Sequence, residues 1–92
     1  MAHLVVELVA ADRKIWAGDA SMVSAPAADG EVGILPGHAP LLAVLRAGQV
    51  RVSPLSGAMV RGEVTGGFLS VDGNRVTIVA DAVTFGSDAP TA

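Results

Sequence analysis

The stretch from Gly30 to Leu45, GEVGILPGHAPLLAVL, decides the fold of this 92-residue chain. Two glycines flank a Glu-Val pair in its first half, and two prolines, a glycine and His38 precede an apolar run in its second half. Glycine reaches backbone angles closed to other residues, whereas each proline removes an amide donor and fixes its own φ. No helix is compatible with this pattern. Residues 35–40 are therefore predicted to form a shaped loop between strands, and we expect function to lie there.

The composition indicates one small domain with an aliphatic core. Hydrophobic residues make up 51% of the chain, with one Trp, two Phe and no Cys, so the fold must be stabilised by burial without disulfides or thiolate metal sites. A net charge of −3 with six basic residues excludes nucleic acid as the main partner. The N-terminus lacks a basic region, and no apolar run is long enough to span a bilayer, so we expect no direct membrane insertion.

Short β-strands separated by turn residues are predicted along the whole chain. Residues 49–53 alternate, with Val50 and Val52 on one face, and residues 59–65 alternate in the same way. The sequence Asp72-Gly73-Asn74 is the clearest hairpin signal, because these residues suit turns with positive φ. A break is expected at Gly18-Asp19, and a bend or bulge at Gly66-Gly67. Further strands are expected at residues 3–10, 15–17, 20–25, 41–45, 68–71, 75–80 and 83–85. This spacing is typical of an all-β sandwich or barrel.

Groups that could carry catalysis are sparse. The two histidines, His3 and His38, have no partner at a metal-ligand spacing, and no serine lies in a nucleophile-elbow sequence. The glycine pairs neither open a helix nor precede Lys-Ser/Thr, so no phosphate loop is expected. We therefore expect a non-enzyme without metal or cofactor, whose rigid loop binds another protein. A small ligand-binding or regulatory β-module, with this loop closing a pocket, is the alternative.

Four ordered motifs resemble the epsilon subunit of F-type ATP synthases. The longest is GEVGILPGHAPLL at 30–42, and the others are ELVAADRKIWAG at 7–18, GGFLSV at 66–71 and VTIVAD at 76–81. The resemblance implies a flattened antiparallel β-sandwich of short strands over residues 1–86. The small and polar residues at 87–92 are expected to form a flexible C-terminal tail. It also implies a non-catalytic rotor subunit that couples the gamma subunit to the c-ring during ATP synthesis. Such a protein is peripheral, on the cytoplasmic face of the bacterial cell membrane.

The same resemblance supplies the candidate partner-binding residues by position. Glu31 matches the acidic residue of the turn that faces the polar loops of the c-ring. His38, Ala43 and Ala10 match the region that faces gamma. By contrast, Leu41 and Leu42 are expected to pack in the sandwich or at its rim.

The C-terminal residues differ from the pattern of the family. There the sandwich is usually followed by two helices that can inhibit ATP hydrolysis, and some members bind ATP through an acid-and-arginine motif at their start. The last residues of this sequence, DAPTA at 88–92, lack the arginine. We expect no ATP binding by the residues present.

Overall fold

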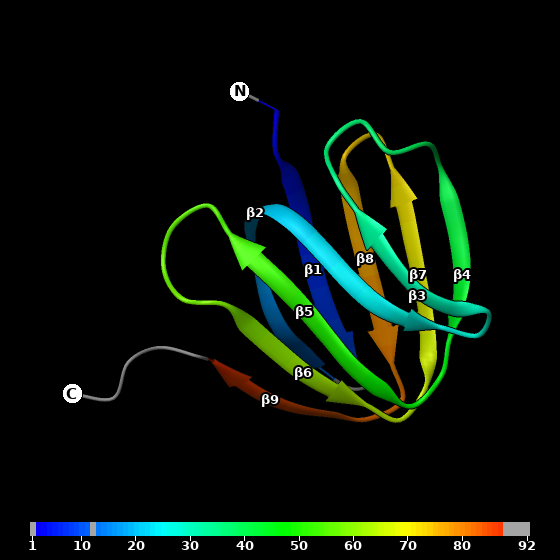
Figure 1. Cartoon of the computed structure of the whole chain (residues 1–92). Coiled ribbons are helices and arrows are strands. Elements are labelled where there is room, and N and C mark those ends of the chain that lie inside the picture. Colours follow the sequence, from blue (N-terminus) through cyan, green and yellow to red (C-terminus); the bar gives the residue numbers. More distant parts are fainter. Residues whose placement is uncertain (1, 12, 88–92) are drawn as a thin grey trace.

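The computed structural model of the chain describes residues 2–11 and 13–87. Nine β-strands and no helix occur among these residues (Figure 1). The strands are β1 (Leu4–Ala10), β2 (Arg13–Ala27), β3 (Gly30–Ile34), β4 (Leu41–Leu45), β5 (Gly48–Pro54), β6 (Val60–Val64), β7 (Gly67–Asp72), β8 (Arg75–Ala80) and β9 (Val83–Ser87). The predicted all-β fold is confirmed.

Two layers of strands share the long strand β2. The first part of β2 pairs with β1, and this layer continues through β8 and β7 to β4 (Figure 1). The last part of β2 pairs with β3 and β5, and this layer continues through β6 to β9. The register against β5 shifts between Ala20 and Met22, where β2 passes from one layer to the other. Ala27 then pairs with Leu45 of β4, so the layers also meet at the far end of β2. This arrangement is the predicted sandwich.

One pair of neighbouring strands differs from the expected antiparallel arrangement. β1 and β8 run parallel, in register from Val5 opposite Arg75 to Ala10 opposite Ala80. The other strand pairings of the described residues are antiparallel. Alternation within a strand shows which face is buried, but it does not show which strand lies alongside. The sheet is therefore mixed at this pair, in a way that the pattern could not indicate.

Aliphatic side chains from both layers fill the interior. The largest fully buried side chains include Leu4, Leu8, Ile34, Leu69 and Ile78, and no polar side chain is buried among the described residues. The layers approach closely at Gly62 of β6, where an added Cβ would lie 3.3 Å from a methyl group of Leu8. Such dense packing resists deformation, because the side chains interlock with few voids.

Strand β2 is longer than the sequence pattern predicts. The expected break at Gly18-Asp19 is wrong, because these residues pair with Val6 and Val5, two consecutive residues of β1. The irregularity of this ladder lies elsewhere, at the register shift between Leu8 and Val9. The ring of Trp16 lies over Gly18, where an added Cβ would be 2.9 Å from the ring, so this glycine makes room for an aromatic side chain. Pro26 also lies within the strand, opposite Glu31 of β3. Strand β3 itself occupies residues that the pattern leaves unassigned.

The predicted glycine turns are confirmed. The hairpin between β7 and β8 turns at Gly73 and Asn74, whose φ angles are 56° and 66°. Two successive residues with positive φ are the requirement of a type I′ turn, which matches the twist of the flanking strands. At the bend before β7, Gly66 and Gly67 have φ angles of 149° and 143°. A side chain at Gly67 would collide with the carbonyl oxygen of Val79.

The last described strand reaches into the expected C-terminal tail. The backbone of Ser87 in β9 still pairs with Val60 of β6. Residues 88–92 of that tail lie outside the described residues. No helix in the described part of the chain is long and apolar enough to cross a membrane.

Candidate partner-binding surface

The loop between β3 and β4 begins with a tight turn. The His38 N–H donates to the Leu35 carbonyl oxygen at 3.1 Å. Pro36 and Gly37 lie between them, and Gly37 has a φ of 87°. Proline followed by a glycine with positive φ fits a type II turn. The shaped loop predicted at residues 35–40 is therefore confirmed.

The partly buried side chain of His38 is oriented by the backbone of the next residue. Its Nδ1 lies 2.6 Å from the carbonyl oxygen of Ala39. A carbonyl oxygen can only accept a hydrogen bond, so Nδ1 carries the proton and donates it. In the neutral ring Nε2 is then the acceptor, which is the nitrogen that a donor on a partner protein would meet.

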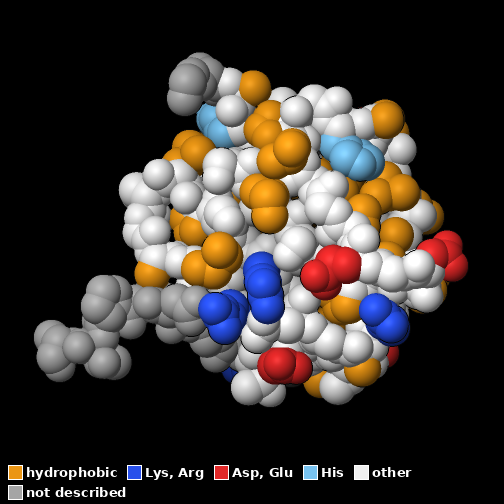
Figure 2. All heavy atoms as spheres, in the orientation of Figure 1, with side chains coloured by type: hydrophobic (Ala, Val, Ile, Leu, Met, Phe, Trp, Pro, Cys, Tyr) orange, Lys and Arg blue, Asp and Glu red, His pale blue; other side chains and the backbone are white. Residues whose placement is uncertain are grey.

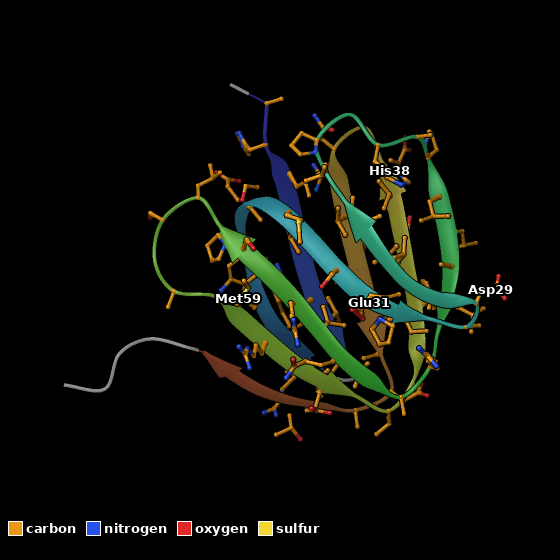
Figure 3. All side chains as sticks on the ribbon, in the orientation of Figure 1. Asp29, Glu31, His38 and Met59 are labelled. Carbon is orange, nitrogen blue, oxygen red and sulfur yellow. The ribbon has the colours of Figure 1, made fainter. Side chains whose placement is uncertain are left out.

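Glu31 lies on an exposed position of β3, opposite Pro26. The turn that precedes β3 contains a second exposed acid, Asp29. Figure 3 shows Glu31 near this turn, whereas His38 lies in the loop beyond the other end of β3. The two polar residues predicted to contact partners therefore lie on opposite sides of β3, Glu31 near its start and His38 beyond its end.

The two alanines predicted to face a partner point largely into the sandwich. Ala10, the last residue of β1, is 7% exposed. Ala43 of β4 is partly buried and packs against the core. The start of β1 lies by the His38 loop, because the Val5 N–H donates to the Asn74 carbonyl and Gly37 N–H donates to the Asn74 side chain. Ala10 is at the other end of β1, so the four predicted residues do not form one cluster.

The structure reveals an exposed apolar surface that the sequence did not predict. Leu42 and Val44 of β4 and Phe68 of β7 are 74%, 66% and 44% exposed. Val44 lies directly opposite Phe68, and Leu42 lies opposite Ser70 two positions along the ladder, so all three side chains share the outer face. We call these three residues the β4–β7 apolar surface. Adjacent exposed apolar side chains of this kind mark interaction sites more often than scattered ones do.

The expectation that Leu42 packs in the sandwich or at its rim is wrong. Leu41 does pack against the core, but its neighbour points to solvent. Five consecutive apolar residues in β4 show no alternation, so their inner face cannot be read from the strand alone. The neighbouring strand β7 does alternate, with Phe68 exposed and Leu69 buried. Its pattern, together with the pairing of Val44 and Phe68, shows which face of β4 points outward.

In the other layer, the outer face of β5 and β6 is polar and of mixed charge. Arg51 of β5 lies opposite Arg61 of β6, and Glu63 lies opposite Gln49. The Arg51 Nε donates to the Gln49 side chain at 2.9 Å. Figure 2 shows basic and acidic side chains interspersed on this side of the molecule. Arg51, Arg61 and Glu63 are exposed, as the alternation of residues 49–53 and 59–65 indicates.

One ion pair lies on the same outer face as the β4–β7 apolar surface. The Lys14 Nζ is 2.9 Å from a carboxylate oxygen of Glu7, between β2 and β1. The hydrogen bond and positive charge of Lys14 lower the pKa of Glu7, with a smaller contribution from the charge of Arg75. Among the described residues, no group of three or more His, Asp or Glu side chains could hold a metal ion.

The comparisons with known proteins agree with this architecture. Residues 3–86 match the family described as ATP synthase, Delta/Epsilon chain, beta-sandwich domain. The ATP synthase epsilon chain of Micrococcus luteus is 51% identical over 97% of this chain and 98% of that protein. That of Rhodococcus erythropolis is 43% identical over 96% of this chain and 73% of that protein.

Solved structures show the same fold. A chain in the cryo-EM structure of the Euglena gracilis mitochondrial ATP synthase, OSCP/F1/c-ring, has a TM-score of 0.85 and 23% identity, over 92% of this chain and 54% of that chain. A chain of the Tetrahymena thermophila mitochondrial ATP synthase central stalk/c-ring has a TM-score of 0.74 and 19% identity, over 88% of this chain and 65% of that chain. From the family match and the bacterial relatives, this chain belongs to the ATP synthase delta/epsilon chain family, whose β-sandwich domain it contains.

Proposed function

We propose that this chain is a non-catalytic rotor subunit of a proton-driven F-type ATP synthase. In this role it couples the gamma subunit to the c-ring during ATP synthesis, as a peripheral protein on the cytoplasmic face of the membrane. Its membership of the delta/epsilon family and its bacterial relatives, which are ATP synthase epsilon chains, support this role.

The β4–β7 apolar surface is the observation that favours a protein partner on this side of the sandwich. Its three side chains are 44–74% exposed, and β4 follows directly on the loop that carries His38. Removing such side chains from water is favourable, so a partner that covers them gains binding free energy. We assign this surface and the His38 loop to gamma. Ala43, in the middle of β4, and Ala10, at the end of β1, are also predicted to lie at the gamma interface, although their side chains point largely into the sandwich.

The opposite end of β3 is assigned to the c-ring. Glu31 is exposed there, and Asp29 adds a second exposed carboxylate at the neighbouring turn. Hydrogen bonds accepted by an ionised carboxylate are stronger than those between neutral groups. Two exposed carboxylates therefore suit the hydrogen-bond donors of the polar c-ring loops. Because Glu31 lies near the start of β3 and His38 in the loop beyond its end (Figure 3), the two partners can bind at the same time.

The architecture between the two assigned sites suits the transmission of torque. Strand β2 takes part in both layers, so rotation of one layer against the other would break its ladder. The aliphatic interior is closely packed, and a packed interior transmits strain because it has few voids to absorb it. A load applied at one site would thus reach the other with little deformation.

Binding to purified gamma tests this function. We expect the chain to co-elute with gamma on gel filtration and to give a one-to-one stoichiometry by calorimetry. Absence of binding, with the chain shown to be folded by circular dichroism, would refute the assignment of gamma as partner. A thermal-shift screen with nucleotides separates the alternative ligand-binding module, because a ligand of the native state raises the melting temperature. We expect no shift with ATP.

A further inference from the structure

Asn74 connects three segments that are distant in the sequence. It lies in the turn between β7 and β8 with a φ of 66°. Its backbone carbonyl oxygen accepts a hydrogen bond of 2.8 Å from the N–H of Val5 in β1. Its side-chain Oδ1 accepts a hydrogen bond of 2.7 Å from the N–H of Gly37 in the loop between β3 and β4. The backbone of Asn74 therefore binds β1, and its side chain binds the loop between β3 and β4.

The bond to Gly37 fixes the turn that presents His38. Within this turn the His38 N–H donates a hydrogen bond of 3.1 Å to the Leu35 carbonyl oxygen. The Gly37 N–H has no role in closing a type II turn, and it is the amide that Asn74 binds. The turn is thus closed by its own backbone and is held against the β7–β8 turn by Asn74.

The conformation of the β7–β8 turn does not by itself require this side chain. Glycine adopts positive φ at least as readily as asparagine, and a type I′ turn accepts glycine at both central positions. The preceding residue, Gly73, already has a φ of 56°. The side-chain amide of Asn74 is therefore separable from the hairpin, and its contact on this side is the Gly37 amide.

We infer that Asn74 is a positioning residue for the gamma-binding loop. By holding Gly37, it keeps His38 and the start of β4 in the orientation that the partner meets. A loop ordered before binding loses less conformational entropy when it binds, so the hydrogen bond raises affinity without touching the partner. This inference rests on the proposed function, in which the His38 loop contacts gamma.

Two substitutions at Asn74 separate the hydrogen bond from the turn. Asn74→Gly removes the acceptor and keeps positive φ accessible, whereas Asn74→Asp keeps an Oδ1 acceptor and tolerates the same backbone conformation. Amide exchange of Gly37, followed by NMR in the isolated chain, reports on the hydrogen bond. Calorimetry with purified gamma reports on binding, and thermal unfolding shows that both variants fold.

We expect Asn74→Gly to accelerate amide exchange at Gly37 and to weaken gamma binding about 3- to 10-fold, as for the loss of one net hydrogen bond. Asn74→Asp should restore both quantities. Faster exchange at Gly37 in Asn74→Gly with unchanged gamma affinity would overturn the inference, because the order of the loop would then not matter for binding. Unchanged exchange would overturn it as well. Failure of the wild-type chain to bind gamma would instead refute the proposed function, and the wild-type titration shows this before any variant is compared.

Discussion

Replacing Leu42 with serine tests the β4–β7 apolar surface directly. Leu42 is the most exposed of its three residues, at 74% in the free chain. Its outward position on β4 means that the core contacts of the sandwich stay intact in Leu42→Ser. The change in the free energy of unfolding should therefore stay within about 0.5 kcal/mol, as is usual for exposed positions.

The expected loss of affinity follows from this exposure. Complete burial of a leucine side chain contributes about 1.5–3 kcal/mol. Scaling by the 74% that is still exposed gives about 1–2 kcal/mol for covering Leu42 with gamma, or roughly a 5- to 30-fold increase in Kd on its removal. Partial coverage by gamma would place the result near the lower end of that range.

Leu55→Ser is the matched control for this substitution. Leu55 is 55% exposed, in the loop between β5 and β6, and Figure 1 shows this loop on the other side of the molecule from β4. Calorimetric titration of gamma with both variants should give a weaker Kd for Leu42→Ser and an unchanged Kd for Leu55→Ser. Equal affinities for wild type and Leu42→Ser would refute the assignment of the β4–β7 apolar surface to gamma. Equal losses in both variants would show that the effect is not specific to this surface.

Three further substitutions test the fold by thermal or denaturant unfolding. Gly67→Ala should destabilise the chain by about 3 kcal/mol or more and lower Tm by roughly 10–25 °C, because φ is 143° and a Cβ would lie 2.8 Å from the Cα of Ala80. Leu8→Ala should cost about 2–5 kcal/mol, since this side chain is 0% exposed between the two layers. Glu7→Gln should lower Tm slightly at neutral pH. Its lowered pKa means that ionised Glu7 contributes stability above the ordinary glutamate pKa of about 4.3, and that this contribution is lost as the pH falls through the lowered value.

Each of these expectations has a clear contrary result. Unfolding of Gly67→Ala at the wild-type temperature would contradict the close approach of β7 to β8. A fully tolerated Leu8→Ala would contradict the packing of β1 against β6. For Glu7→Gln, the difference in Tm from wild type should disappear in acid and shrink at high salt, because an exposed ion pair is screened. A difference that grows in acid would contradict the role of the Lys14 pair.

Strands with one exposed face could be predicted from the sequence. In β5, Val50 and Val52 are buried while Arg51 between them is exposed, as the alternation indicates. The β7–β8 hairpin was likewise visible, because Gly73 and Asn74 suit positive φ at adjacent positions. In both cases the residue types of a few consecutive positions are enough to predict the local structure.

Features that depend on tertiary neighbours could not be predicted in this way. Gly18 suggested a break in β2, but in the structure its lack of a side chain leaves space for the ring of Trp16. The parallel pairing of β1 with β8 cannot be recognised from the sequence of either strand. The exposure of Leu42 depends on the register of β4 against β7, which a uniformly apolar strand does not reveal. Most of the candidate surface was therefore missed, although the loop that presents His38 was predicted.

Cross-linking from single cysteines would test most directly whether this chain joins two partners. The sequence has no cysteine, so Glu31→Cys and His38→Cys each introduce a single thiol. Each thiol is labelled with a photoactivatable maleimide, and the chain is then assembled into the complete ATP synthase and illuminated. We predict that position 31 attaches to a c subunit and position 38 to gamma. Attachment of both positions to the same subunit, or of neither in a fully assembled complex, would contradict the proposed coupling role.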